Sequence, residues 1–396
     1  MRSFVVATVA LVLGSGVGFS GGDSQKRQKS DRVDVLIKQL GDDNFAKREA
    51  ASKELEAIGK PALQALRKAA SSSSDLEIRR RAERAYKAIY DRFAQKAEEI
   101  RRIRWPGVHV YNTTFSPDGR LFLAGGDGGT LRLFEVKSGK LVRELIGHGG
   151  WTQQAVFTPD GKHVLSASMD GTLRLWELDT GKEVRKFVGH GGGVHGVALT
   201  RDGKWAVSGG EDKTLRLWEV ATGKELRKFE GHTNTCWGLF TPDDKQILSH
   251  SFDNTLRLWD VTNGNEVRKF VGHTEHVFGV FILPGGKQAL SYAADRTARV
   301  WDLATGKEVI KLKLGDNLSN IRGLALSPDG KRILVGHDGG PTVRLIELTT
   351  GNEIHRFNLA TNPRGLSFSP DGRLAASGSW RGIVYLWRMP GLFDVE

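Results

Sequence analysis

Four groups of serine, histidine, aspartate and tryptophan recur along this chain at nearly constant spacing. In each group the aspartate follows the histidine by 21 or 22 residues, the tryptophan follows it by 27 or 28, and the serine precedes the aspartate by four. Serine, histidine and aspartate held together can perform nucleophilic chemistry. The groups are His148, Ser166, Asp170 and Trp176; His190, Ser208, Asp212 and Trp218; His232, Ser249, Asp253 and Trp259; and His273, Ser291, Asp295 and Trp301.

Other residues that could support catalysis are sparse. Cys236 is the single cysteine, which excludes an intramolecular disulfide and a thiolate metal cluster. The histidines at 195, 250, 276 and 337 could approach one face, but zinc needs ligands that converge, and the sequence does not show convergence. The chain also has no Gly-Lys-Ser loop to hold a phosphate. We therefore expect no catalytic residue, no cofactor and no metal.

The tryptophans of the four groups belong to a longer repeat. Phe134, Trp176, Trp218, Trp259, Trp301, Ile346 and Trp387 follow one another at intervals of 41 to 45 residues, and all except Trp387 precede Asp or Glu. Gly-His pairs precede four of these copies, and hairpin signals such as Ser-Pro-Asp-Gly at 116–119 recur in phase. This pattern resembles the WD-repeat (WD40) family of β-propellers, from about residue 99 to the end of the chain.

The resemblance implies a structural role for the four groups. Carboxylate, imidazole, hydroxyl and indole N–H are expected to satisfy one another inside each blade, where a substrate has no access. The first, sixth and seventh copies depart from the pattern, because Gly128, Gly340 and Arg381 stand where aspartate is expected. These three blades are neighbours in a closed ring, so one arc should be held mainly by apolar packing.

A short segment before the first full repeat is predicted to close the ring. Residues 99–104, EIRRIR, match the outer-strand segments 183–188 and 266–271, EVRKFV, whereas the seventh copy ends nine residues after Trp387. An N-terminal strand can complete the last blade and remove its open edge. The alternative is a continuing helix, because Ala97, Ile100 and Ile103 keep helical spacing.

The region before the propeller divides into three parts. Residues 1–20 contain one arginine, an apolar run and small residues, a pattern typical of an export signal removed near Ser20; a retained membrane anchor would need about 20 apolar residues. Residues 21–30 are expected to form a flexible linker. Residues 31–98 show paired amphipathic helices that resemble HEAT repeats. The predicted fold is therefore mainly β: a seven-bladed WD-repeat propeller (99–396) closed by an N-terminal strand and preceded by a small all-α HEAT-like domain.

The charge of the chain leaves a second type of partner open. The formal net charge is +12, and residues 23–104 hold 21 Lys and Arg against 14 Asp and Glu. A basic helical region could bind nucleic acid or another acidic polymer, but alternating acidic residues favour a solvated surface. We expect nucleic acid not to be the partner.

The propeller family commonly binds peptides at the narrower face of the ring. Counting from each repeat junction predicts a partner-binding surface at that face, and aromatic and arginine side chains are frequent at binding hot spots. The predicted residues are Tyr111, Trp237, Phe252, Phe278, Arg322, Arg364 and Trp380. We expect an exported, monomeric, non-enzymatic scaffold whose partner is an acidic or aromatic peptide, and which touches a membrane only if the signal is retained. A propeller hydrolase or lactonase is the alternative.

Overall fold

The computed structural model describes residues 31–93, 97–314, 321–338 and 340–390, and the predicted signal and linker lie outside them. The chain divides into a helical unit, which includes residues up to Gln95, and a β unit spanning Lys96–Pro390. None of the described helices combines the length and the hydrophobicity of a membrane-spanning segment.

The helical unit consists of paired helices around a small aliphatic core. Residues 31–39 are helical and precede α2 (Phe45–Ile58), η1 (Lys60–Ala62), α3 (Leu63–Ser72) and α4 (Leu76–Phe93). The Asn44 side chain caps α2, whose C-cap is Gly59 with a φ of 72°. Leu36, Leu55 and Ile89 are fully buried in the core. Pro61 lies in the 3₁₀ turn η1, and α3 begins after this turn at Leu63.

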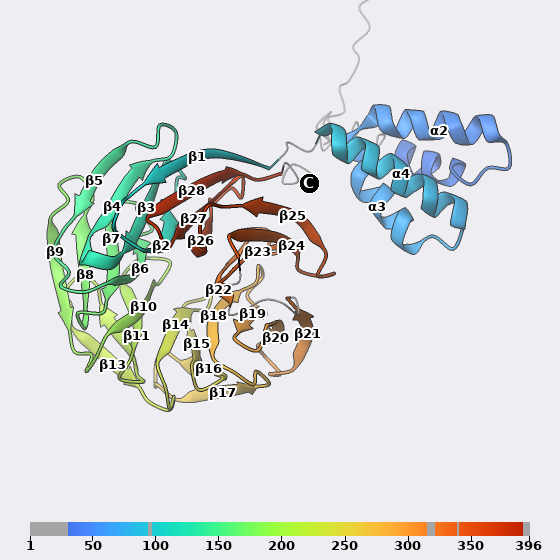
Figure 1. Ribbon diagram of the computed structural model, residues 1–396. Helices are drawn as coiled ribbons and strands as arrows, with labels where there is room; N and C mark the ends of the chain where they lie inside the picture. The colour runs from blue at the N-terminus through green and yellow to red at the C-terminus, as the bar shows by residue number, and fades with distance from the viewer. Residues whose placement is uncertain (1–30, 94–96, 315–320, 339, 391–396) are drawn as a thin grey trace, which may run out of the picture. The chain divides into compact units, whose positions relative to one another are not determined.

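The β unit is a ring of seven four-stranded antiparallel sheets, which we call blades 1 to 7 in chain order (Figure 1). The strands of each blade are given below from the innermost to the outermost. Blade 1 contains β2 (Val110–Phe115), β3 (Leu121–Gly126), β4 (Leu131–Glu135) and β5 (Leu141–Leu145); blade 2, β6 (Thr152–Phe157), β7 (His163–Ser168), β8 (Thr172–Glu177) and β9 (Glu183–Val188); blade 3, β10 (Val194–Leu199), β11 (Trp205–Gly210), β12 (Leu215–Glu219) and β13 (Glu225–Phe229); and blade 4, β14 (Cys236–Phe240), β15 (Gln246–Ser251), β16 (Thr255–Asp260) and β17 (Glu266–Val271). Blade 5 contains β18 (Val277–Ile282), β19 (Gln288–Ala293), β20 (Thr297–Asp302) and β21 (Glu308–Lys313); blade 6, β22 (Ile321–Leu326), β23 (Arg332–His337), β24 (Thr342–Glu347) and β25 (Glu353–Asn358); and blade 7, β26 (Pro363–Phe368), β27 (Leu374–Ser379), β28 (Ile383–Arg388) and β1 (Glu98–Arg104).

The predicted closure by an N-terminal strand is confirmed. β1 pairs antiparallel with β28, and Ile103 lies opposite Val384. The Glu98 and Arg388 side chains form an ion pair with a 2.6 Å separation between Oε1 and Nη1. The strand starts one residue before the predicted segment, and the alternative of a continuing helix is wrong because α4 ends at Phe93.

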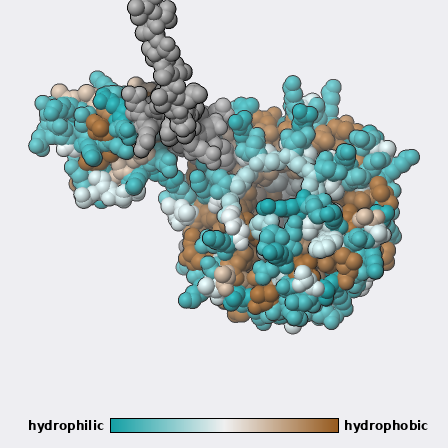
Figure 2. Space-filling model, turned by 180° about the vertical axis from the view of Figure 1, so that it is seen from behind, coloured by the Kyte–Doolittle hydropathy of each residue, from teal (hydrophilic) through white to brown (hydrophobic). Residues whose placement is uncertain are grey.

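Apolar packing between blades forms the core, and outer-strand arginines link neighbouring blades. Arg185 on β9 donates to the carbonyl of Val220 in blade 3, and Arg268 on β17 donates to Ala304 in blade 5, with N···O distances of 3.0 and 2.7 Å. Blades 5 and 6 have no arginine at this position of the outer strand, because Ile310 and His355 stand there. In Figure 2, hydrophobic residues interrupt the hydrophilic surface of the propeller in several places.

The arginine side chains lie close to turns of the next blade and leave no room there for a side chain. This yields a first prediction. Gly223 has a φ of +76°, and a Cβ there would lie 2.8 Å from Cδ of Arg185. Gly161 has a φ of +68°, and a Cβ added there would have no other atom within 4 Å. We expect Gly161→Ala to lower the free energy of unfolding by about 1 kcal/mol through backbone strain alone, and Gly223→Ala by about 2 kcal/mol because Arg185 must also move. Urea unfolding measures both, and equal losses would contradict a role for Arg185.

Candidate functional site

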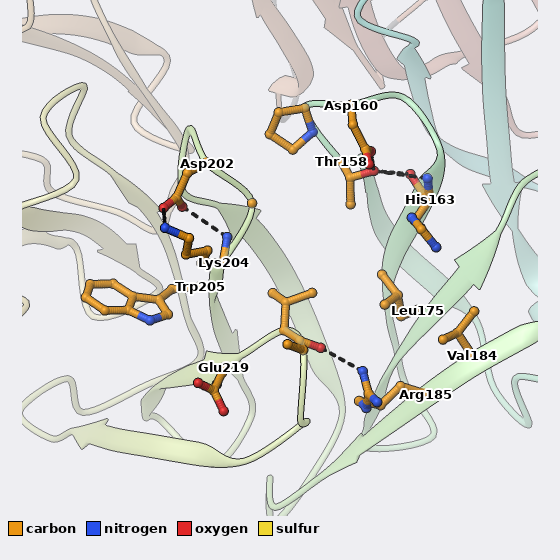
Figure 3. Close-up of a pocket in the computed structure, with 14 residues that line it drawn as sticks. Thr158, Asp160, His163, Leu175, Val184, Arg185, Asp202, Lys204, Trp205 and Glu219 are labelled. Atoms are coloured by element: carbon orange, nitrogen blue, oxygen red, sulfur yellow. Dashed lines mark hydrogen bonds and ion pairs between the residues drawn. The ribbon is translucent and has the colours of Figure 1, made fainter.

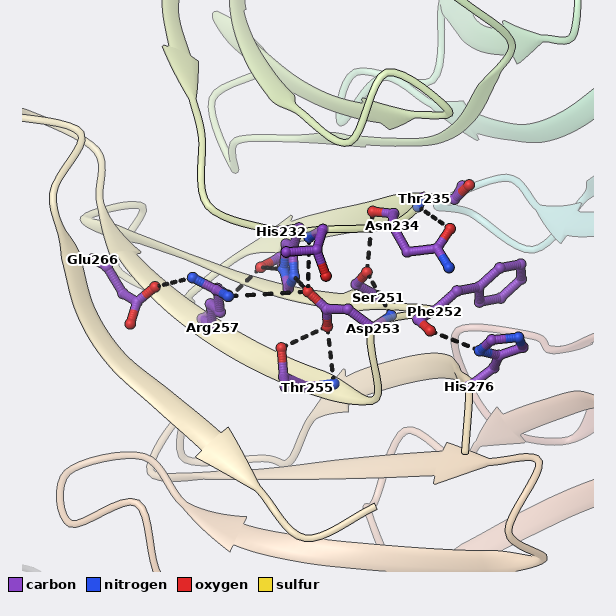
Figure 4. A network of polar contacts seen from close by, with 12 residues as sticks. His232, Asn234, Thr235, Ser251, Phe252, Asp253, Thr255, Arg257, Glu266 and His276 are labelled. Carbon is purple, nitrogen blue, oxygen red and sulfur yellow. Dashed lines mark hydrogen bonds and ion pairs between the residues drawn. The ribbon is translucent and has the colours of Figure 1, made fainter. Parts of the chain in front are cut away.

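The structure shows the hydrogen bonds of the four repeated groups, one group in each of blades 2 to 5. In blade 4, His232 Nδ1 lies 2.7 Å from Asp253 Oδ2 (Figure 4). The Nε2 atom of His232 lies 2.8 Å from Ser249 Oγ. Trp259 Nε1 donates to the same hydroxyl at 2.8 Å. The equivalent His–Ser and Trp–Ser distances in blades 2, 3 and 5 are 2.7 and 2.8 Å.

This connectivity matches that of a hydrolase triad, but the surroundings prevent catalysis at these serines. Ser166, Ser208, Ser249 and Ser291 have no exposed surface, and each hydroxyl is already occupied by an indole N–H. A nucleophile must reach a substrate carbonyl, and these oxygens cannot. The groups instead connect the loop that enters each blade to its second and third strands.

The electrostatics of the four groups favour an ionised aspartate, and in blade 2 they also favour a neutral histidine. Burial opposes the charge of Asp253, but hydrogen bonds from His232, Thr255 and the backbone keep its pKa well below the usual value. Burial also outweighs the neighbouring carboxylate at His148 and lowers the pKa of that imidazole.

The three irregular blades use different contacts at these positions. In blade 1, Asp127 Oδ2 accepts from the backbone N–H of His109 at 3.0 Å and lies 2.6 Å from its Nδ1. In blade 6, Ile346 packs in a hydrophobic cluster. In blade 7, Tyr385 stacks on Trp387 with a centroid separation of 5.8 Å and accepts from the backbone of Ala360.

A cavity of about 500 Å³ lies at the centre of the ring, lined by the innermost strands. Five predicted partner-binding residues line it: Tyr111, Trp237, Phe252, Phe278 and Arg364. Trp380 lies outside the lining but covers Arg364, whose Cζ is 4.7 Å from the centroid of a Trp380 ring. Arg322 belongs to β22, but its side chain lies outside the described residues. That these residues bind a partner stays a prediction.

Trp237 occupies a position in its strand that differs from the expected one. In most inner strands one extra residue, such as Tyr111 or His195, interrupts the pairing with the second strand. The pairing of β14 is continuous, and Trp237 lies opposite His250, so Trp237 is equivalent to Gly196 rather than to His195. Repeat counting alone left the position of Trp237 open by one residue, because blade 4 is one residue shorter at this point.

Arg364 is less available than its residue type suggested. It pairs with Gly378 across the sheet, and its side chain is only 10% exposed. Its Nη2 lies 3.2 Å from Asp338 Oδ1, and Trp380 covers its guanidinium. A partner approaching this side of the cavity therefore meets Trp380 before Arg364.

Four aromatic rings from three blades form a continuous row beside the cavity, which we call the aromatic cluster: Trp380, His109, Tyr111 and Trp151. The successive ring centroids are 4.8, 6.2 and 5.8 Å apart. Trp151 is 50% exposed and Trp380 is 42% exposed. Burial and the Asp127 carboxylate raise the pKa of Tyr111 to about 12, so the phenol remains neutral. Sequence reasoning missed His109 and Trp151, which lie in the loops before β2 and β6.

Burial of His250 predicts an acid-sensitive stability. Burial lowers the pKa of His250 to about 3, and the backbone of Phe278 offsets this only in part. Because the folded state holds the neutral form, the stability that His250 supports is complete above a pH of about 6.5 and decreases as the pH falls toward 3. We expect a loss of about 2 kcal/mol from this residue between about pH 7.5 and 5.

Urea unfolding at these two pH values would measure the loss. His250→Phe keeps a ring against Trp237, with which the imidazole stacks at 5.1 Å, but removes the titration. The variant should therefore show a smaller loss of stability on acidification than the wild type. An unchanged pH dependence would contradict the assignment to His250.

The described residues contain no group of three or more His, Cys, Asp or Glu side chains that could hold a metal ion. The β unit is a repeat propeller of seven blades that is closed by a strand from the N-terminal side. In four blades a His–Asp–Ser–Trp group fixes the entry loop to the strands. Propellers of this class are typically non-enzymatic interaction scaffolds.

Comparison with known proteins identifies the family. The family model "WD domain, G-beta repeat" matches residues 102–135, 139–177, 181–219, 223–260 and 264–302, and "Anaphase-promoting complex subunit 4 WD40 domain" matches 296–371. The model "HEAT repeats" matches residues 7–87 and so overlaps the predicted export signal. The chain is a WD-repeat β-propeller protein with N-terminal HEAT repeats.

One curated relative has local similarity. A stretch of 74 residues is 31% identical to "Autophagy-related protein 18" of Meyerozyma guilliermondii. The match covers 18% of this chain and 13% of the length of that protein.

Proposed function

We propose that this protein is a non-enzymatic scaffold whose propeller binds a protein partner through the aromatic cluster. The observation that carries the proposal is the exposure of Trp151 and Trp380 at the two ends of a row of contacting rings beside the central cavity. Tryptophan and tyrosine side chains bury large areas with few rotatable bonds and dominate many interfaces. The exposed parts of Trp151 and Trp380 do not contribute to packing within the propeller and are therefore available to a partner.

The surroundings of the aromatic cluster favour an apolar or aromatic partner segment over an acidic one. The Arg364 charge is compensated by Asp338, and Asp127 places another carboxylate beside His109. Trp237, Phe252 and Phe278 extend the aromatic surface into the cavity, with Trp237–Phe252 and Phe252–Phe278 centroid distances of 4.9 and 5.8 Å. A side chain inserted from the partner would therefore meet aromatic rings.

The basic helical region gives weaker support for binding an acidic polymer. Arg81 forms ion pairs with Glu49 and Glu77 at 2.6 Å, and Arg32 pairs with Glu54 at 2.7 Å. These contacts compensate part of the positive charge before any polymer arrives.

Affinity capture from native extract, followed by mass spectrometry, tests the proposed surface. The double variant Trp151→Ala, Trp380→Ala should lose the partners captured by the wild-type chain, and Arg364→Glu should have the smaller effect. Val271→Ala removes a side chain that is 70% exposed elsewhere on the propeller and should capture the same partners as the wild type. An unchanged set of partners in the double variant would reject the aromatic cluster.

We also propose that the protein is exported and that its signal is removed near Ser20. The support is the apolar run and the small residues of the first 20 positions. Mass spectrometry of the N-terminus of the mature protein would test this. Recovery of peptides from residues 1–20 in the mature chain would reject removal.

A further inference from the structure

A second candidate surface lies at the end of the propeller away from the aromatic cluster. The turns between first and second strands meet there, because antiparallel strands place alternate turns at opposite ends of a blade. A groove of about 450 Å³ runs between blades 2 and 3 at this end (Figure 3). Leu175 and Val184 of blade 2 and Val220 of blade 3 contribute its apolar surface, together with Pro159 and Trp205.

Trp205 distinguishes this groove from the repeated framework of the propeller. It begins β11, and the residues that begin the second strands of the other blades are Leu121, His163, Gln246, Gln288, Arg332 and Leu374. The Trp205 side chain is 39% exposed. Since glutamine or histidine satisfies the same position elsewhere, the fold does not require an indole here.

Fixed carboxylates lie in the groove with this tryptophan. Thr158 Oγ1 donates to Asp160 Oδ1 at 2.6 Å, and Thr200 Oγ1 donates to Asp202 Oδ1 at 2.8 Å. Backbone N–H of Lys204 and the Thr200 hydroxyl lower the pKa of Asp202 to about 2, so this carboxylate is ionised at neutral pH.

The charges of the groove differ in sign from the charge of the whole chain. Asp160, Asp202 and Glu219 line the groove together with only two cations, Arg185 and Lys204. Lys204 Nζ already lies 3.1 Å from Asp202 Oδ2, and Arg185 donates to the Val220 carbonyl at 3.0 Å. An excess of carboxylates on a chain of net charge +12 favours a cationic ligand at this place.

The groove between blades 4 and 5 provides an internal comparison. It has a volume of about 730 Å³ and the same framework, in which Pro242, Asp243, Leu258, Val267 and Arg268 replace Pro159, Asp160, Leu175, Val184 and Arg185. In this second groove Gly285 stands at the position of Asp202, and Gln288 begins β19 as Trp205 begins β11. The framework is therefore shared, whereas Trp205 and Asp202 distinguish the first groove from the second.

We propose that the groove between blades 2 and 3 binds an extended segment of a partner protein in which prolines alternate with lysine or arginine. A proline ring packs on the Trp205 indole and on the aliphatic floor, and an extended proline-rich backbone loses little entropy on binding. The flanking cation approaches Asp160 and Asp202. This surface is separate from the aromatic cluster and does not depend on it.

The test uses the full chain and the peptide acetyl-Lys-Pro-Pro-Lys-Pro-Pro-Lys-amide, titrated by isothermal calorimetry at low salt. Saturable binding is expected, and Trp205→Gln should weaken it by about tenfold, as for a tryptophan hot spot. Asp202→Gly should weaken it by about fivefold, and added salt should reduce this difference. Both substitutions copy residues of blade 5, so the propeller is expected to tolerate them, and circular dichroism checks this.

Three controls make the result specific. The peptide with glutamate in place of lysine should bind at least about tenfold more weakly than the lysine peptide. Trp380→Ala should leave the affinity unchanged. Adding Gln288→Trp to the Trp205→Gln variant should restore part of the binding at the second groove, where Gly285 is kept because its φ of +91° disfavours a side chain. Absence of saturable binding, equal affinity of Trp205→Gln and wild type, equal affinity of the acidic peptide, or failure of Gln288→Trp to restore binding would overturn the proposal.

Discussion

Asp253→Ala is expected to lower the free energy of unfolding by about 3–5 kcal/mol, because several buried hydrogen-bond donors lose their shared acceptor and each costs about 1–3 kcal/mol. The Asp253 side chain is only 6% exposed and accepts from Thr255 Oγ1 at 2.6 Å, while its Oδ2 lies 2.7 Å from His232 Nδ1. Removing the carboxylate takes the hydrogen-bond acceptor away from His232 and Thr255 Oγ1, and from the backbone N–H groups of Thr233 and Thr255. These donors then lie in a nearly dry interior without their acceptor.

Urea unfolding followed by circular dichroism measures this effect. Asp179→Ala is the matched control, because Asp179 is an exposed aspartate in the turn between β8 and β9. It should change the unfolding free energy by less than about 0.5 kcal/mol. A loss for Asp253→Ala as small as that of the control would show that the His–Asp–Ser–Trp group does not stabilise the blade.

Ile103→Pro is expected to destabilise the propeller by about 3 kcal/mol or more, because it disrupts the closing strand. The backbone N–H of Trp105 donates to Gly382, so the N–H of Ile103, two residues earlier in a regular strand, also points toward β28. Proline removes this donor and leaves an acceptor of β28 without its ladder partner.

The neighbouring residue supplies the control on the same strand. The N–H of Arg102 points away from β28, where proline is tolerated on an edge strand. Arg102→Pro should therefore cost less than Ile103→Pro, and Ile103→Ala separates the loss of side-chain packing from the loss of the hydrogen bond. Equal thermal unfolding midpoints for the two proline variants would argue against closure through this ladder.

Repetition made most of the fold predictable. A period of 41 to 45 residues marks every blade, and the match of residues 99–104 to later outer strands predicted the strand that pairs with β28. The hydrogen-bonding groups were predictable for the same reason, since identical spacings place the same four side chains together in each regular blade. Local sequence carries this information because every group lies within about 30 residues.

The binding surface was less predictable, because its geometry depends on contacts between blades. Trp151, Tyr111 and Trp380 come from three blades, and only the closed ring brings them together with His109. Arg364 looked available from its residue type, but Asp338 of blade 6 compensates it. The position of Trp237 differs because β14 lacks the unpaired residue that interrupts most inner strands. Counting residues along the sequence cannot show at which point of the blade that residue is absent.

The pairing of β1 with β28 also has a consequence for biogenesis. Glu98 and Arg388, which meet at this joint, are 290 positions apart, so a ribosome makes β1 long before it makes β28. During synthesis the early strand has to wait while six complete blades and most of the seventh emerge. Contacts this distant in sequence form slowly, so the nascent chain remains an open arc with two unsatisfied ends until β28 has been synthesised.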